Sequence, residues 1–246
     1  LYVRDDSIDI DEGWNGTITN ALVIQGEAEG NHCIEADGIG SYNASEAAKN
    51  ADFIARGLHS APTINNLTCI ISPNLGGTHG EGAGWRLREG IEPTINDSLV
   101  ISSFMTNDAT DGYDNYCQRI DGAETNPTLN SIIFACQENA KCNAFGGFAD
   151  EQAWAESNGN QFATVTDGAA LDPSAANDAD LHLLEGTNSV YSIAWSTSLV
   201  DGAAPTAATQ PTAGTYLGAM DAASDWISGW TYGIEEGNRG QALWFE

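Results

Sequence analysis

The strongest constraint on the fold of this chain is an internal sequence repeat. Four segments align without gaps, and each is rich in β-branched residues and alternates in polarity, as β-strands do. The segments are 17–24, 63–70, 94–101 and 128–135. Two positions of the repeat are aliphatic, namely Ile18, Ile64, Ile95 and Leu129 at the first and Ile24, Ile70, Ile101 and Ala135 at the second. We expect each set to stack as a buried column with a spacing of about 4.8 Å.

A second short strand precedes each segment and ends in an acidic residue followed by glycine. These corners are Glu12-Gly13, Asp37-Gly38, Glu89-Gly90 and Asp121-Gly122. The corner glycines are 25, 52 and 32 residues apart, and one coil of a parallel β-helix takes roughly 20 to 30 residues. The longest interval holds an insertion at 39–62, with a helical stretch near 44–58. The spacing therefore favours stacked coils with one lateral excursion.

A β-sandwich with similar strands is the alternative architecture. A sandwich would place hairpin signals such as Asn-Gly between adjacent strands, whereas these repeats recur in one direction without them. The repeat ends near residue 136, and the tail holds Trp226, Trp230 and Trp244. These tryptophans either pack within a cap over the last coil or form an aromatic platform for sugar rings.

Several motifs resemble a known family. They are Asp5-Asp6-Ser7-Ile8-Asp9, Gly13-Trp14-Asn15-Gly16, Val23-Ile24-Gln25-Gly26, Ile34-Glu35-Ala36-Asp37, Arg86-Leu87-Arg88-Glu89-Gly90 and Trp226-Ile227-Ser228-Gly229-Trp230-Thr231. Along nearly the whole chain they resemble mostly uncharacterised bacterial secreted or surface proteins expected to form right-handed parallel β-helices. The resemblance implies no established activity. Its members usually carry more β-helical sequence before the Asp-Asp-Ser element.

We therefore predict an all-β protein in the form of a right-handed parallel β-helix. About four coils are expected over residues 1–136, with a lateral insertion at 39–62. An irregular C-terminal capping region is expected over residues 137–246. Because the first coil begins at once, without a polar or helical segment before it, we expect another polypeptide to cover it. That partner is either the N-terminal part of a precursor or a neighbouring subunit.

The charge of the chain narrows the classes of partner. The 246 residues include 35 acidic and 8 basic side chains, which gives a net charge of -27. Such a surface repels phosphate backbones, so nucleic-acid binding is disfavoured. No apolar run reaches the roughly 18 residues of a membrane-spanning helix. The balance is typical of soluble proteins from marine or halophilic bacteria, and cations are the expected partners.

Five cysteines lack the paired spacing of a zinc site. They are Cys33, Cys69, Cys117, Cys136 and Cys142. Their pattern favours disulfides, and hence an extracellular or cell-surface location, although the sequence does not define the pairing. The four histidines are scattered at 32, 59, 79 and 182 without a pair on one strand or helix face, so no histidine metal site is predicted.

Acidic residues are the predicted metal ligands. If the coils stack, the corner acids Glu12, Asp37, Glu89 and Asp121 form a column of like charges, which calcium would bridge through carboxylate oxygens. The other interpretation is turn chemistry, because Asp and Glu before glycine form corners. A denser cluster at Asp5, Asp6, Asp9 and Asp11 is the first choice for a calcium site.

Arginines next to acids form a second candidate site. Arg86, Arg88 and Arg119 lie on the short strands near Glu35, Asp37 and Asp121. By analogy with β-helical polysaccharide lyases, Arg88 or Arg119 would be the base and calcium would neutralise the uronate. A structural ladder of arginines and acids explains the same residues, because arginine is a poor base. We therefore predict an extracellular structural or binding module, with a calcium-dependent carbohydrate-active enzyme as the alternative.

Overall fold

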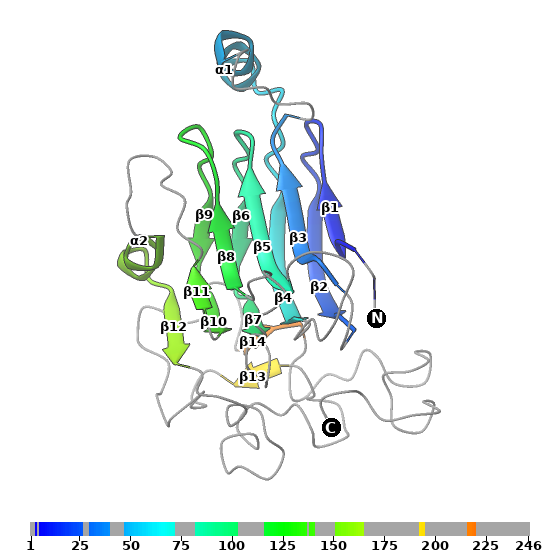
Figure 1. Ribbon diagram of the computed structural model, residues 1–246, viewed down its shortest axis with the longest axis vertical. Coiled ribbons are helices and arrows are strands. Elements are labelled where there is room, and N and C mark those ends of the chain that lie inside the picture. The colour runs from blue at the N-terminus through cyan, green and yellow to red at the C-terminus, as the bar shows by residue number, and fades with distance from the viewer. Residues whose placement is uncertain are drawn as a thin grey trace, which may run out of the picture.

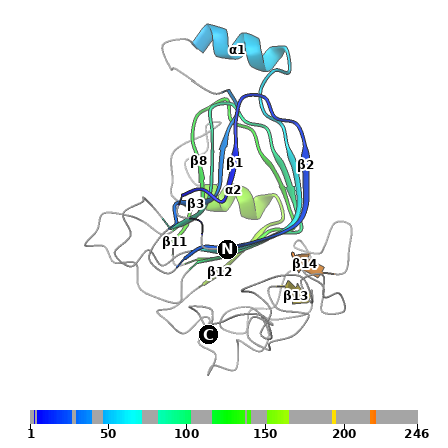
Figure 2. The ribbon, with the colours of Figure 1, turned by 90° about the vertical axis from the view of Figure 1, so that its right-hand side faces the viewer.

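The chain alternates between two parallel β-sheets that face each other across a common core. The computed structural model describes residues 3, 5–26, 30–39, 47–71, 82–102, 116–136, 138–140, 151–164, 192–194 and 216–219. In these residues each strand of one sheet is followed along the chain by strands of the other. Figure 2 looks along the stack and shows the two layers side by side.

The first sheet has five parallel strands in the order β1-β3-β5-β8-β11. They are β1 (Ile8–Ile10), β3 (His32–Asp37), β5 (Ala83–Arg88), β8 (Tyr116–Ile120) and β11 (Glu138–Ala140). Their order along the sheet is their order in the sequence, so each pass of the chain adds one strand at the same side (Figure 1).

The second sheet has seven strands and the same progression. They are β2 (Thr17–Ile24), β4 (Thr63–Ile71), β6 (Thr94–Asn96), β7 (Leu99–Ser102), β9 (Thr128–Asn130), β10 (Ile133–Cys136) and β12 (Gln161–Thr164). The sheets continue past residue 136, because β11 pairs with β8 and β12 pairs with β10. A small antiparallel pair joins β13 (Ser192–Ala194) to β14 (Tyr216–Gly218).

Two helices lie outside the sheets. Helix α1 (Ala47–Ala55) falls within the predicted insertion and projects from one end of the strands (Figure 1). Helix α2 (Glu151–Ser157) lies beside the last strands of both sheets (Figure 1). Neither of them, nor any other helix in the described part of the chain, is long and apolar enough to cross a membrane.

The predicted aliphatic columns are confirmed. Ile64 pairs in register with Ile18 on one side and Ile95 on the other, and Ile95 pairs with Leu129. The second column runs through Ile24, Ile70, Ile101 and Ala135. Ile64, Ile95 and Leu129 are buried, while Ile18, on the edge strand β2, is only partly so.

An asparagine ladder runs beside these columns. The Asn96 side-chain amide donates to Asn65 Oδ1 at 2.8 Å, and that of Asn130 donates to Asn96 Oδ1 at 2.9 Å. The next residue of each repeat has a positive φ, at Asn20, Asn66, Asp97 and Ser131. Residues with short polar side chains tolerate this left-handed conformation, so the Thr-Ile-Asn repeat marks a bend of the coil.

A disulfide between Cys33 and Cys69 ties β3 to β4. Both cysteines are buried in the core, and Cys117 is disulfide-bonded as well. The expectation that the cysteines form disulfides is therefore confirmed for these three residues. Further along the core, Trp85 packs edge-on against Phe134, with ring centroids 5.3 Å apart.

The predicted column of corner acids is wrong in register. Asp37 lies opposite Arg88, one residue earlier than the predicted Glu89. Gly38 lies against the Glu89-Gly90 corner, where an added Cβ would come 2.3 Å from the carbonyl carbon of Gly90. Glu12 and Glu89 themselves adopt positive φ, as does the glycine after each, so at those two places the turn chemistry holds.

Side chains take over hydrogen bonding at the far end of the stack. Glu151 at the start of α2 is fully buried and accepts a hydrogen bond from the Ile120 backbone N–H. Asn160 accepts from the Ile132 N–H at 3.0 Å and donates to the Leu129 carbonyl at 3.2 Å. These contacts satisfy backbone groups at the ends of β8 and β9 that the next strand does not reach.

The aliphatic column predicts a large effect of truncation at its centre. We expect Ile95→Ala to lower the free energy of unfolding by about 2–5 kcal/mol, because Ile95 is fully buried between two neighbours. Leu58→Ala is the control, since Leu58 is 46% exposed, and it should change stability by no more than about 0.5 kcal/mol. Urea unfolding followed by circular dichroism measures both, and equal losses would contradict the buried column.

The buried carboxyl of Glu151 predicts a dependence of stability on pH. Burial raises its pKa to about 9, and the charge of Asp121 raises it, although the Ile120 hydrogen bond and Arg119 oppose the shift. The folded protein then holds a proton that the unfolded chain loses near pH 4.5, so stability falls as pH rises from there to about 9.

Glu151→Gln tests this, because glutamine keeps the shape of the protonated acid without titrating. We expect the variant to lose much of the decline in melting temperature between pH 5 and 9, and to exceed the wild type in stability at the alkaline end. The same decline in both proteins would rule out Glu151 as its source.

Candidate functional site

The outward face of the five-stranded sheet carries rows of charged side chains. One row runs across four strands in register, from Asp9 to Glu35, Arg86 and Arg119. A second row pairs Asp37 with Arg88. The residues point outward because they alternate with the buried Ile34, Ala36, Leu87 and Ile120.

Ion pairs join most of this face into one network, which we call the charged ladder. Its members are Glu35, Asp37, Arg86, Arg88, Arg119 and Asp121. Arg88 donates to both oxygens of Asp37, at 2.6 and 3.0 Å. Asp121 accepts from Arg86 at 3.2 Å and lies 2.9 Å from Arg119 Nε. The structural interpretation of the arginines is therefore confirmed for all three.

The ladder makes Arg88 a worse base than a free arginine. Burial by itself lowers the pKa of Arg88, but the hydrogen bond and charge of Asp37, with Glu35 and Glu89, raise it above its ordinary value. A base must release its proton at the working pH, and these carboxylates hold the proton in place. Arg119 likewise donates to Asp121, at 3.0 Å.

At the border between β1 and β3, by contrast, carboxylates face carboxylates. Asp9 lies directly opposite Glu35, and like charges at such positions repel. Burial raises the pKa of Asp9, and the charges of Asp6, Asp11, Asp37 and Asp5 raise it further. All of these causes raise the pKa of Asp9, as expected where carboxylates gather at one border.

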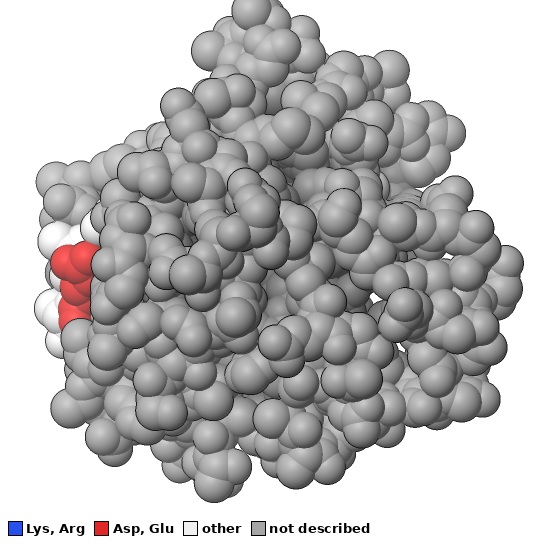
Figure 3. All heavy atoms as spheres, turned by 90° about the horizontal axis from the view of Figure 1, so that it is seen from below, with Lys and Arg blue, Asp and Glu red and all other residues white. Residues whose placement is uncertain are grey.

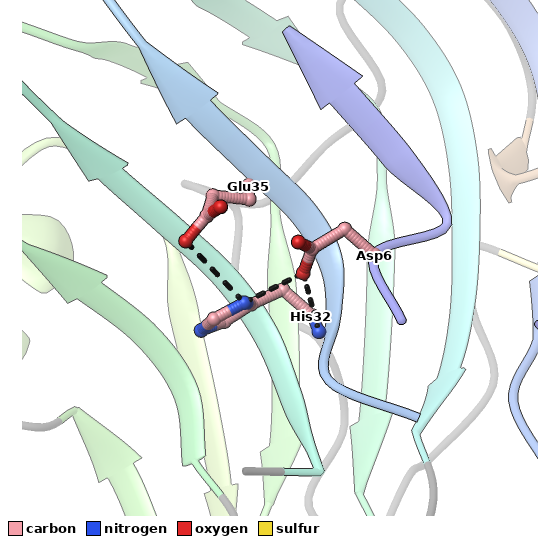
Figure 4. Close-up of side chains that lie close together, drawn as sticks. All are labelled: Asp6, His32 and Glu35. Carbon is pink, nitrogen blue, oxygen red and sulfur yellow. Dashed lines mark hydrogen bonds and ion pairs between the residues drawn. The ribbon is translucent and has the colours of Figure 1, made fainter. Parts of the chain in front are cut away.

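One histidine enters this border from the end of β3. His32 Nδ1 lies 2.7 Å from Asp6 Oδ1 and 3.9 Å from Glu35 Oε1 (Figure 4). Burial would raise the pKa of Asp6, but the hydrogen bonds and charge of His32 outweigh it, and the pKa is lowered. Among the described residues, Asp6, His32 and Glu35 are the one group of three whose potential ligand atoms lie within 4.8 Å of one another.

The eight predicted calcium ligands are divided among three places. Asp5, Asp9, Asp11 and Glu12 lie exposed around β1. Asp6 is turned toward His32, and Asp37 and Asp121 belong to the charged ladder, with Glu89 at 3.9 Å from Arg88 Nε. These residues do not converge on one centre, and calcium binding by them stays a prediction. The view from below shows acidic side chains among the described residues at its left edge (Figure 3).

The sequence analysis did not identify two polar residues that make buried contacts in the structure, His32 and Glu151. His32 was set aside because no second histidine accompanies it, while its partners are carboxylates and the Tyr116 hydroxyl, 3.1 Å from Nε2. Glu151 carried no motif, and only its place at the start of a helix marked it. The tryptophans at 226, 230 and 244, proposed as a cap or a sugar platform, lie outside the described residues.

Comparison with known proteins places the chain in a family. The family model described as a pectate-lyase-like beta helix domain matches residues 1–231. Neither a curated protein nor a solved structure gives a match. The match supports the resemblance to β-helical proteins, and it agrees with the mostly parallel strands of the structure. On this evidence, the chain belongs to the family of pectate-lyase-like β-helix domains.

Proposed function

We propose that the chain is an extracellular or cell-surface module that binds acidic polysaccharide through calcium rather than cleaving it. In this proposal the fold is a right-handed parallel β-helix of about four regular coils with a C-terminal capping region. The observation that carries the binding role is the charged ladder, in which each of its arginines bonds to a carboxylate. The ladder offers a fixed polar surface and no free base.

Calcium is the expected bridge because the face is acidic at one end. The carboxylates around β1 outnumber the arginines there, so an acidic glycan would be repelled unless a divalent cation lay between them. Asp9, Asp11 and Asp5 are exposed and supply the oxygen ligands that calcium takes. The direction of the pKa shift of Asp9, which burial raises and the neighbouring carboxylates raise further, supports a cation at this place.

A calcium-dependent carbohydrate-active enzyme is the second candidate. The family description and the presence of arginines and carboxylates on one outward face favour it. A lyase of this kind would need Arg88 or Arg119 to abstract a proton, against the pKa shift of Arg88. Incubation with polyuronates and calcium separates the candidates, because a lyase releases unsaturated uronates that absorb in the ultraviolet and a binding module does not.

We also propose that another polypeptide adds to the β1 and β2 side of the stack. In the described chain β1 pairs with β3 and β2 pairs with β4, so both are edge strands. Edge strands present backbone donors and acceptors to a further strand. The partner is either more of the same precursor or a neighbouring subunit, and a head-to-tail arrangement of subunits could extend.

Calcium binding is tested by thermal unfolding. We expect millimolar calcium chloride to raise the melting temperature more than sodium chloride of equal ionic strength, because specific binding adds to screening. Asp9→Asn keeps the side-chain shape and should reduce both this increment and calcium-dependent retention on immobilised polyuronate. Equal increments from the two salts would show that screening alone acts.

Assembly is tested by light scattering of the chain at micromolar concentration. We expect a mass above that of one 25.9 kDa chain. Thr19→Pro should reduce the association, because it removes a backbone N–H from the open side of the edge strand β2, while Asn15→Pro in the exposed loop serves as the control. A stable monomer at all concentrations would contradict the proposed neighbouring subunit.

A further inference from the structure

The group formed by Asp6, His32 and Glu35 has the donors of a small metal centre. Asp6 precedes β1, while His32 and Glu35 come from β3, so two passes of the chain meet here (Figure 4). One imidazole nitrogen and two carboxylates face a common space, with all three ligand atoms within 4.8 Å. The side chain of His32 is 2% exposed, that of Asp6 10% and that of Glu35 20%.

The hydrogen bonds within this group engage Asp6 but not Glu35. Asp6 Oδ1 accepts from the His32 backbone N–H at 2.9 Å and lies 2.7 Å from the ring. Glu35 Oε1 is 3.9 Å from the same ring nitrogen, which is too far for a hydrogen bond. Asp6 and Glu35 both present a carboxylate oxygen to the same ring nitrogen, so a cation between the two carboxylates would relieve the repulsion of like charges.

Arginine provides only part of that relief. Arg88 Nη1 lies 3.3 Å from Glu35 Oε1 and Arg86 Nη1 lies 3.8 Å from it. Arg88, however, makes its two short hydrogen bonds to Asp37, and Arg86 makes its own to Asp121. The arginines therefore lie on the side of Glu35 that faces the charged ladder. They do not lie between Glu35 and the pair formed by His32 and Asp6.

The other nitrogen of the ring is already held as in a metal-binding histidine. His32 Nε2 lies 3.1 Å from the hydroxyl of Tyr116, which comes from β8 and is fully buried. With Nδ1 as a metal ligand, Nε2 carries the proton and donates a hydrogen bond to the Tyr116 oxygen. Such an outer contact fixes the tautomer and the orientation of a ligating imidazole.

We propose that Asp6, His32 and Glu35 bind a divalent transition-metal ion such as Zn²⁺, with His32 Nδ1 as the nitrogen ligand. The metal replaces the proton now shared between His32 and Asp6. A mixed set of one imidazole and two carboxylates suits Zn²⁺ and its neighbours, whereas calcium takes six to eight oxygens. This site is separate from the proposed calcium ligands Asp9 and Asp11, and it would fasten residue 6 to the sheet.

Isothermal titration of the full chain, without a histidine tag and freed of metal by a chelator, tests the site. We expect one equivalent of Zn²⁺ to bind the wild type, and His32→Gln to weaken the affinity at least about 100-fold. Glu35→Gln should also weaken it, and Tyr116→Phe should weaken it by roughly 10-fold through the lost outer contact. Asp52→Asn, which removes an exposed carboxylate on helix α1 away from this group, is the matched control and should leave Zn²⁺ affinity unchanged.

Cobalt gives a readout that does not depend on folding of the His32 variant. Bound Co²⁺ should produce visible absorption bands in the wild type and in Asp52→Asn, and much weaker bands in Glu35→Gln, which keeps the His32 contact with Asp6. Calcium-dependent retention on polyuronate should persist in folded His32→Gln, so loss of one site does not imply loss of the other. The proposal would be overturned if the wild type did not bind the metal stoichiometrically. It would also be overturned if His32→Gln and Glu35→Gln bound the metal as tightly as the wild type.

Discussion

In-register parallel stacking is the constraint on which the rest of this structure depends. Each position of a strand lies against its own counterpart in the next strand of the same sheet, so every such column must tolerate contact between like residues. Aliphatic residues do so by packing, as Ile64 does between Ile18 and Ile95. Asparagine does so because its amide both donates and accepts, and each hydrogen bond of the ladder contributes on the order of 1 kcal/mol. Charged residues of one sign repel each other in such a column. The column must therefore alternate in sign, or a group of opposite charge must lie beside it.

The charged face holds one pair of like charges that a counter-charge compensates and one pair beside which further acids lie. Arg86 and Arg119 are neighbours of like charge, but Asp121 accepts from both and compensates them. Asp9 and Glu35 are also neighbours of like charge, and the acidic residues around them raise rather than lower the repulsion. With 8 basic against 35 acidic side chains, the chain cannot place an arginine at every such border. A bound cation is the compensation that we propose for this edge.

The columns could be predicted from the sequence because they repeat one residue type at one spacing. The same alignment failed for the corner acids. An acid and a glycine occur at each corner, but Asp37 is in register with Arg88 and not with Glu89. The contacts of His32 were beyond sequence reasoning for another reason. Its partners lie 26 residues earlier and 84 residues later, and only the register of three strands brings them together. Contacts that recur in every repeat can thus be predicted from the sequence, whereas a contact that occurs once between distant residues cannot.

The two ends of the stack are treated differently, and this difference bears on function. At the far end the carboxyl of Glu151 and the amide of Asn160 occupy the places of strand partners, so the backbone there is satisfied by side chains. At the near end the described edge strands β1 and β2 keep the regular backbone of their sheets. That edge also holds Asp6 and Asp9, so a strand added beside β1 must bring basic side chains or accept a cation at the junction. The proposed cation and the proposed partner strand would therefore act on the same border, and each would favour binding of the other.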